Sequence, residues 1–360
     1  MIISEVHVRK GALSDAVIAD REAPTLGEGM VRLVVESFSV TANNVTYAVV
    51  GDGFRYWDFF PAPEGLGIVP MWGHARVMES RHPDIAVGER VYGYLPMASH
   101  LDVLPGKVTA SGFADVSEHR QPMSPIYNQY ARLAADPEHD GQREGERMIF
   151  GPLFRTGFLI EYFLRANDWF GANQLVITSA SSKTALGLAS VAKDNSPHIR
   201  RIGLTSPSNV SFVEATGLYD QVVAYDAIAS IAAMPSISVD FAGNAGLLGQ
   251  VQRHLGDSLN YSCLVGATHV DARSTLGGGS VMPGPKPVLF FAPDHAVALF
   301  RELGTEEATR QIAAAWRGFL AATQGTIAIT RLNGLVEARR VFCEMLAGKV
   351  DPSQGIVIEP

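Results

Sequence analysis

The spacing of hydrophobic residues divides the chain into two kinds of sequence. Residues 1–110 have β-strand patterns: 31–40 alternates around Val, Leu and Phe, and 88–97 has strand composition between turn signals. Residues 111–149 are polar and are expected to form loops. Further along, short β-branched runs alternate with helical segments, which is typical of βαβ units on a parallel sheet.

The expected strands of this βαβ region are short and apolar. They are residues 175–179, 201–206, 221–225, 237–243, 262–267 and 287–294, with helical segments after most of them. The remaining sequence then predicts a helix, a strand, a helix and a last strand, over 306–323, 325–332, 334–348 and 355–360.

Composition narrows the class of protein. The chain has 360 residues, which fits two domains, and its 47% hydrophobic and 18% charged residues suit a well-packed protein. Its net charge of −8, without a Lys/Arg-rich run, argues against nucleic acid or an anionic membrane as partner. No run approaches the roughly 20 apolar residues of a membrane helix, and the N-terminal residues lack a signal-peptide core. We therefore expect a cytoplasmic protein.

Several kinds of chemistry are excluded because the sequence lacks the motifs that they require. The sequence has no HExxH, CxxC or GxSxG motif and no phosphate loop ending in GK[ST]. Its histidines do not stand at metal-ligand spacing with Cys or Glu, and Cys263 and Cys343 are isolated. We therefore expect neither a disulfide nor a protein-bound zinc ion.

One strand–turn–helix, residues 174–194, has the layout of a dinucleotide-binding turn but no glycine in the turn. Ser179, Ser182 and Ala185 occupy the three glycine positions of that motif. A phosphate at the helix N-terminus would be bound by side-chain hydroxyls and a cation, whereas in a glycine turn the backbone itself approaches the phosphate closely. These groups belong to Ser179, Ser181, Ser182, Lys183 and Thr184. The alternative is an ordinary serine-capped helix.

The order of segments resembles the medium-chain dehydrogenase/reductase superfamily, in its zinc-independent, quinone-oxidoreductase-like branch. The resemblance spans nearly the whole chain and rests on "VRLVVESFSVTANNVTYAVVGD", "VPMWGHARVMESRHPDIAVGERVYGY", "GPLFRTGFLIEYFL", "ITSASSKTALGLASVAK", "GLYDQVVAYD" and "LAGKVDPSQGIVIEP". It implies an α/β fold with a Rossmann-type doubly wound sheet and a GroES-like β-barrel catalytic domain. The catalytic domain would comprise 1–149 and 295–360, and the coenzyme-binding domain 150–294.

The same resemblance bears on zinc. The zinc-using branch has a cysteine where this chain has "TANNVT". His74 aligns with a core position of the barrel and has no partner ligands in the sequence around it. The implied enzyme therefore works without zinc.

NADPH is the expected cofactor. Folds that prefer NADH place Asp or Glu at the end of the second strand of the parallel sheet. Here the segment Thr205–Val213 contains no acid, and Ser206, Ser208, Asn209 and Lys183 offer donors to a 2′-phosphate. A plain polar turn is the alternative interpretation of this segment.

Further site residues follow from the resemblance. Thr156 matches the family threonine near the nicotinamide, and oxyanion donors are expected in the "TANNVTY" turn and the "IYNQY" loop. The catalytic candidates are Asn43, Asn44, Tyr47 and Tyr127, with Asn128 and Tyr130 beside the last. The remaining cofactor candidates are Gly243, Asn244, Phe290, Phe291 and Ala292. The alternative is a structural role: asparagine side chains in turns that hydrogen-bond to nearby backbone, and tyrosine side chains that pack in the core.

The first functional hypothesis is an NADPH-dependent reductase of a conjugated C=C or a carbonyl. Its rivals are a nucleotide-binding protein that has lost redox chemistry and a non-redox, lyase-like enzyme. The substrate is expected to be a small apolar or aromatic molecule, because aromatic residues gather in one segment. These residues, Phe54, Tyr56, Trp57, Phe59 and Phe60, would line a pocket, form a packed lid or make a homodimer contact.

Overall fold

The computed structural model describes residues 1–265 and 284–360. The chain separates into two compact units, one of Met1–Ile149 with Ala328–Pro360, and one of Phe150–Ile327. The boundary after residue 149 coincides with the division expected from the sequence.

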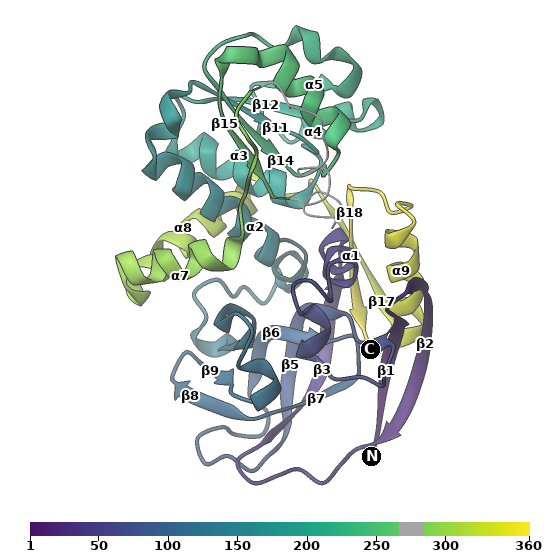
Figure 1. The fold of residues 1–360 in the computed structure, drawn as a ribbon. Coiled ribbons are helices and arrows are strands. Elements are labelled where there is room, and N and C mark those ends of the chain that lie inside the picture. Colours follow the sequence, from purple (N-terminus) through teal and green to yellow (C-terminus); the bar gives the residue numbers. More distant parts are fainter. Residues whose placement is uncertain (266–283) are drawn as a thin grey trace. The chain divides into compact units, whose positions relative to one another are not determined.

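The second unit is built on a parallel sheet (Figure 1). Its strands are β11 (Gln174–Ile177), β12 (Arg200–Thr205), β13 (Gln221–Ala224), β14 (Ser236–Asp240), β15 (Leu259–Leu264) and β16 (Val288–Leu289). They lie in the order β13-β12-β11-β14-β15-β16, and every neighbouring pair is parallel. The chain moves outward from β11 on one side and from β14 on the other. This is the Rossmann order, with its switch point between β11 and β14.

Helices cover both faces of this sheet. They are α2 (Glu144–Ala166, whose first residues belong to the first unit), α3 (Lys183–Asn195), α4 (Val210–Ala215), α5 (Ala245–Leu255), α7 (Ala292–Leu303) and α8 (Thr305–Ala322). On one face, Leu247, Val251 and Leu255 of α5 pack with Val176 and Ile202 of the sheet. Because the crossovers on the two sides of the switch point run in opposite directions, α3 lies on the other face, as Figure 1 shows.

Helices α2 and α3 cross very closely. A Cβ added to Gly157 of α2 would lie 2.4 Å from the backbone nitrogen of Leu188 on α3, which no real side chain tolerates. Gly187 of α3 also lies near α2, since its added Cβ would be 3.0 Å from the Cα of Phe154. Two facing glycines therefore set the position of α3, and with it the turn that precedes α3.

The sequence analysis expected residues 295–327 in the same domain as residues 1–149. In the structure they belong to the second unit. The ring of Trp316 on α8 lies 5.2 Å from that of Phe154 on α2, and the ring of His295 on α7 lies 5.0 Å from that of Phe163 on α2. The aromatic side chains on these helices are buried against α2, which the sequence pattern alone did not reveal.

The first unit is mostly antiparallel. Its strands are β1 (Ile2–Arg9), β2 (Ala12–Glu22), β3 (Val31–Val40), β4 (Leu66–Gly67), β5 (Pro70–Ser80), β6 (Arg90–Pro96), β7 (His100–Val103), β8 (Pro105–Thr109), β9 (Gly112–Asp115), β10 (Gln129–Arg132), β17 (Ala328–Asn333) and β18 (Gln354–Glu359). One sheet has the order β2-β1-β4. The other has the order β17-β18-β3-β5-β6-β10-β9-β8, with β7 also paired to β3.

Two helices accompany these sheets, α1 (Ala42–Val49) and α9 (Leu335–Leu346). The strand expected over 31–40 is confirmed as β3. The segment 111–149, expected to be loop, instead contains β9, β10 and the start of α2. Each of these strands has only 4 residues, so no long apolar run predicts them. The predicted fold class, a mixed α/β protein with a parallel sheet and a second multi-stranded sheet, is confirmed.

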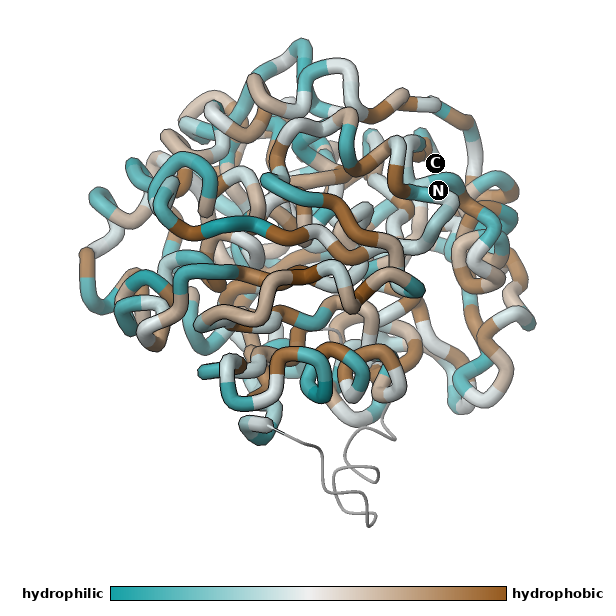
Figure 2. The backbone as a smooth tube through the Cα atoms, turned by 90° about the horizontal axis from the view of Figure 1, so that it is seen from above, coloured by the Kyte–Doolittle hydropathy of each residue, from teal (hydrophilic) through white to brown (hydrophobic). Residues whose placement is uncertain are grey.

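Hydropathy along the backbone follows this architecture. Hydrophobic stretches alternate with hydrophilic ones along the chain (Figure 2). Within the described residues, no helix combines the length and the apolar character that crossing a membrane requires.

Candidate cofactor site and tyrosine cluster

The turn after β11 has the backbone of a glycine turn although it contains serine. Ser179 adopts φ of +48°, in the left-handed region that glycine usually occupies. Ser182 then has extended φ and ψ and caps α3, because its hydroxyl accepts a hydrogen bond from the backbone N–H of Ala185 at 3.3 Å. The missing glycine has therefore not changed the course of the chain.

This geometry gives a stability prediction. Ser179→Gly should raise the free energy of unfolding by up to about 1 kcal/mol, because the left-handed conformation costs about 1–2 kcal/mol without glycine and the extra freedom of unfolded glycine offsets part of the gain. Ser182→Ala should instead lower it by about 1 kcal/mol through the lost cap. Urea unfolding of both variants provides the measurement. A destabilised Ser179→Gly would show that the serine hydroxyl matters more than its backbone.

The structure brings together the two turns that the sequence analysis predicted to bind phosphate. The side-chain nitrogen of Asn209 donates to the hydroxyl of Ser181 at 3.1 Å, which links the turn after β12 to the turn after β11. Ser206 and Ser208 share a hydrogen bond of 3.0 Å. Lys183 and Thr184 form the first turn of α3, and both are half-buried. The predicted donors thus form one group at the carboxyl edge of the sheet.

The switch point itself is held by a residue that the sequence analysis did not single out, Asp240. Its buried carboxylate accepts hydrogen bonds from the Thr178 hydroxyl and from the backbone N–H groups of Ala242 and Gly243. Burial raises its pKa above the ordinary value, and the same hydrogen bonds partly oppose that rise. An acid ending an otherwise apolar strand was the available signal.

The remaining cofactor candidates lie along the same edge. Gly243 has φ of +62°, and the side chain of Asn244 caps α5 by accepting from the N–H of Leu247 at 3.0 Å. The hydroxyl of Thr205, at the end of β12, is buried and has no hydrogen-bond partner among the described residues. A buried polar atom without a partner at this edge suits a site that receives a ligand.

Thr156 and residues 290–292 make contacts within the second unit. Thr156 donates to the carbonyl of Pro152 at 3.2 Å within α2. The ring of Phe290 stacks on that of His295 with centroids 3.9 Å apart. Phe291 precedes α7, and Ala292 begins it. The strand expected over 287–294 is therefore shorter in the structure, because the helix starts within it.

In the first unit, two catalytic candidates belong to a tyrosine cluster, which we define as Tyr47, Tyr56, Tyr94 and Tyr127 with Trp72. The ring of Tyr127 lies 4.8 Å from Tyr94 and 5.7 Å from Tyr56, and the Tyr56 and Tyr127 hydroxyls are 2.9 Å apart. The hydroxyl oxygen of Tyr47 accepts from Asn43 at 2.7 Å and from the Trp72 indole at 3.1 Å. Since both lone pairs of that oxygen are used, the Tyr47 O–H can only donate.

These tyrosines remain protonated well into the alkaline range. Burial, reinforced by the neighbouring tyrosines, raises the pKa of Tyr127 well above 10. Burial also raises the pKa of Tyr47. Tyr127 is half-buried, as is Trp72, whereas Tyr47, Tyr56 and Tyr94 are buried. The cluster can supply neutral hydrogen-bond donors.

Other polar candidates of the first unit form hydrogen bonds with backbone groups of the protein. Asn44 accepts from the backbone of Thr41 and donates to the carbonyl of Pro70. Asn128 donates to the carbonyl of Arg120, and the hydroxyl of Tyr130 donates to the carbonyl of Tyr94. Of the aromatic segment, all but the half-buried Phe54 lie buried in the core of this unit.

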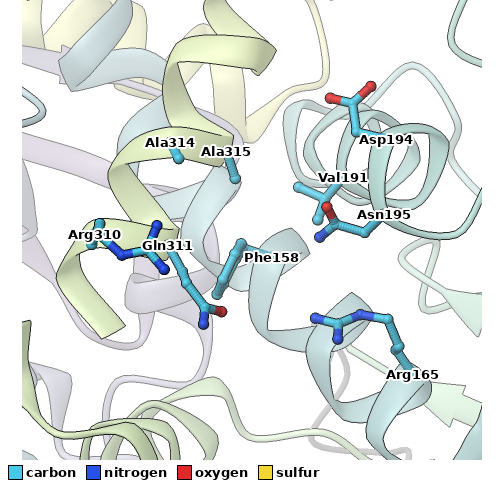
Figure 3. A pocket seen from close by; sticks show the side chains of 9 residues that line it. All are labelled: Phe158, Arg165, Val191, Asp194, Asn195, Arg310, Gln311, Ala314 and Ala315. Carbon is cyan, nitrogen blue, oxygen red and sulfur yellow. The ribbon is translucent and has the colours of Figure 1, made fainter. Parts of the chain in front are cut away.

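A pocket of about 480 Å³ lies elsewhere in the second unit (Figure 3). It is lined from α2, α3 and α8, by Phe158, Arg165, Val191, Asp194, Asn195, Arg310, Gln311, Ala314 and Ala315. The α3 residues are the last ones of the helix. Because α3 begins at the carboxyl edge of the sheet, this pocket lies toward the amino edge, away from the predicted dinucleotide site.

Comparison with protein families gives a match over most of the sequence. The model of DUF2855, described as a protein of unknown function, matches residues 38–351. The chain belongs to this family. No curated protein matches the chain.

Solved structures similar to this DUF2855 member include two proteins described as oxidoreductases and one crystallised with NADPH. CurA from Vibrio vulnificus in complex with NADPH is 17% identical with a TM-score of 0.58, covering 100% of this chain and 98% of that one. A probable oxidoreductase from Mycobacterium abscessus is 15% identical with a TM-score of 0.59, covering 100% and 99%. The yhdH oxidoreductase from Salmonella enterica in complex with NADP is 13% identical with a TM-score of 0.54, covering 100% of both chains. At these identities the likeness establishes the fold.

Proposed function

We propose that this protein is an NADPH-dependent oxidoreductase whose second unit binds the cofactor at the carboxyl edge of its parallel sheet. The observation that carries the proposal is the turn after β11, where Ser179 takes the left-handed backbone of the first motif glycine and leads into capped helix α3 beside the switch point. The similar structures that hold NADPH or NADP support it.

The residues present fit a dinucleotide. In this proposal the N-terminus of α3 faces the pyrophosphate, where helix N–H groups and the helix dipole favour an anion. The hydroxyls of Ser181 and Ser182 replace the close backbone approach that glycine allows, and we assign the amine of Lys183 to the 2′-phosphate. The partnerless hydroxyl of buried Thr205 is then available to the cofactor on the β12 side.

NADPH is preferred over NADH because of charge. The end of β12 and the following turn offer hydroxyls and an amide, from Ser206, Ser208 and Asn209, and the segment Thr205–Val213 contains no acid. A carboxylate at this point would hold the ribose hydroxyls of NADH and repel a 2′-phosphate.

When bound, NADPH supplies a hydride to the β-carbon of a conjugated C=C or to a carbonyl carbon. The protein must then hold the negative charge that develops on the substrate oxygen, which preorganised donors do at roughly 2.7–4 kcal/mol each. We assign this task to the tyrosine cluster, with Tyr127 as the donor and Tyr47 in support. Its aromatic rings suit a small apolar or aromatic substrate, and the step requires no zinc.

Titration of the purified protein with NADPH, followed by nicotinamide fluorescence, tests the proposal. We expect saturable binding in the micromolar range, followed by NADPH oxidation when a quinone or an α,β-unsaturated ketone is added. Binding without oxidation by either acceptor class would favour a nucleotide-binding protein without redox chemistry. Absence of binding at millimolar NADPH would reject the cofactor site itself.

Lys183 provides a prediction about cofactor preference. Lys183→Ala should weaken NADPH binding about tenfold and NADH binding much less, because a charge-assisted hydrogen bond to the 2′-phosphate contributes about 1.5–3 kcal/mol. Lys193→Ala is the matched control, since Lys193 lies in the last turn of the same helix and donates to the carbonyl of Gly217. The measurement is the dissociation constant of each variant for NADPH and for NADH. Equal weakening of binding to both cofactors would indicate that Lys183 contacts the pyrophosphate instead.

A further inference from the structure

His74 occupies an unusual place for a histidine. It lies in β5, its side chain is fully buried, and neither ring nitrogen has a hydrogen-bond partner among residues 1–265 and 284–360. A neutral imidazole carries one donor and one acceptor, and buried polar atoms are nearly always paired. A partner for this ring is therefore missing from the protein's own hydrogen bonds.

Two further ligand-type side chains lie beside His74. His139 precedes α2 and Glu144 begins it, and one ligand atom from each of the three residues lies within 4.8 Å of the others. The Nε2 of His139 is 3.8 Å from Oε1 of Glu144, and the Nδ1 of His139 is buried without a partner. The sequence analysis treated His74 as a lone core histidine, because its neighbours come from far along the chain.

We propose that His74, His139 and Glu144 bind a divalent transition-metal ion, zinc in the first place. Two imidazoles and a carboxylate are a common zinc ligand set, and three protein ligands leave a position for water. Tetrahedral zinc at bond lengths of about 2.0–2.1 Å needs ligand atoms about 3.4 Å apart. Side-chain rotations that shift the atoms by about 1 Å bring the present arrangement to that geometry.

The nearby arginines do not prevent cation binding, because each is paired with carboxylates. Arg90 donates to both oxygens of Glu144, at 2.7 and 3.1 Å, and to Glu36 at 2.7 Å. Arg147 forms ion pairs with Asp136 and Glu138. A metal ion bound to one Glu144 oxygen leaves the other oxygen hydrogen-bonded to Arg90. Arg90 then orients the Glu144 carboxylate as a metal ligand.

Among the described residues, no other group of three His, Cys, Asp or Glu side chains has this geometry.

The metal ion would link the segment before α2 to the larger sheet of the first unit, since His74 lies on β5 between β3 and β6. The site lies wholly within the first unit and does not depend on the proposed cofactor. It also differs from the "TANNVT" position at which the resembled zinc enzymes carry a cysteine, so it assigns no part of hydride transfer to zinc.

The test is metal binding by the full-length protein. After chelator treatment, equilibrium dialysis against ZnSO₄ should show one zinc per chain, and Co²⁺ should give the visible absorption of a low-coordinate N/O site. His139→Ala and Glu144→Gln should each weaken zinc binding about 100-fold or more, because each removes one of three ligands. Both side chains are partly exposed, so the variants should fold, which circular dichroism checks.

His100→Ala is the matched control. His100 is a half-buried histidine of the same unit that hydrogen-bonds to Ser99 and lies outside the trio. It should bind zinc as the parent does. The proposal is overturned if the parent protein binds no zinc at micromolar concentration, or if the two ligand variants bind it as tightly as the parent and His100→Ala do.

Discussion

Ser182→Leu should abolish NADPH binding, with a loss of at least about 100-fold in affinity. Ser182 caps α3 at the point where the phosphate would approach the helix N-terminus. A leucine side chain fills that space and removes the hydroxyl, so both the site and its donor are lost. Fluorescence titration with NADPH measures the effect, and circular dichroism confirms that the variant folds despite losing a cap worth about 1 kcal/mol.

Ser182→Gly is the matched control for this result. It removes the same hydroxyl but opens space for the phosphate, and glycine is nearly as good a cap as serine. We expect NADPH binding to be kept or improved, because a glycine turn allows closer backbone approach. If Ser182→Leu bound NADPH as well as the parent, the turn would not be a phosphate site, and the non-redox alternative would be preferred.

Tyr127→Phe should lower kcat by about 10²-fold or more while leaving the NADPH dissociation constant unchanged. The phenol is proposed to hold the oxyanion and deliver a proton, contributions that range over about 10²–10⁴ in rate. The substitution keeps the ring and its aromatic neighbours, so packing changes little. Steady-state kinetics with a quinone or an unsaturated ketone measures kcat, and fluorescence titration measures cofactor affinity.

Tyr56→Phe separates catalysis from hydrogen bonding within the cluster. It removes the same 2.9 Å contact between the two hydroxyls but leaves the hydroxyl of Tyr127 in place. Its kcat should fall much less. Because burial holds the pKa of Tyr127 well above 10, kcat of the parent should show no loss from tyrosine ionisation between about pH 7 and 10. Equal losses in the two variants would point to packing rather than proton donation.

Much of the fold could be predicted from sequence because its local signals agree. Val31–Val40 alternates and forms β3, and the β-branched runs from Leu175 onward form the parallel sheet in the expected order. The turn at Ser179 was found through its place between strand and helix rather than through its residues. Its left-handed backbone was not predictable, since serine seldom adopts it.

The parts that were missed depend on contacts between distant segments. Asp240 lies in the strand expected over 237–243, but only the parallel pairing of β14 with β11 places it beside Thr178. His74 and His139 meet through the packing of the segment before α2 on β5, with no spacing rule to reveal them. Likewise, the burial of α7 and α8 against α2 decided where the second unit ends.

The sheet of the first unit is completed by strands from the far end of the chain. β18 pairs with β3 through Ile356, Val357 and Ile358, whereas the second unit is a continuous stretch between the two pieces. During synthesis the first 149 residues therefore emerge with β3 paired to β5 and β7 but without β18 along Phe38–Val40. An open strand edge of this kind invites pairing with other chains. The second unit can fold on the ribosome before the first. Exposure of this part of the β3 edge should therefore last until β18 has been made.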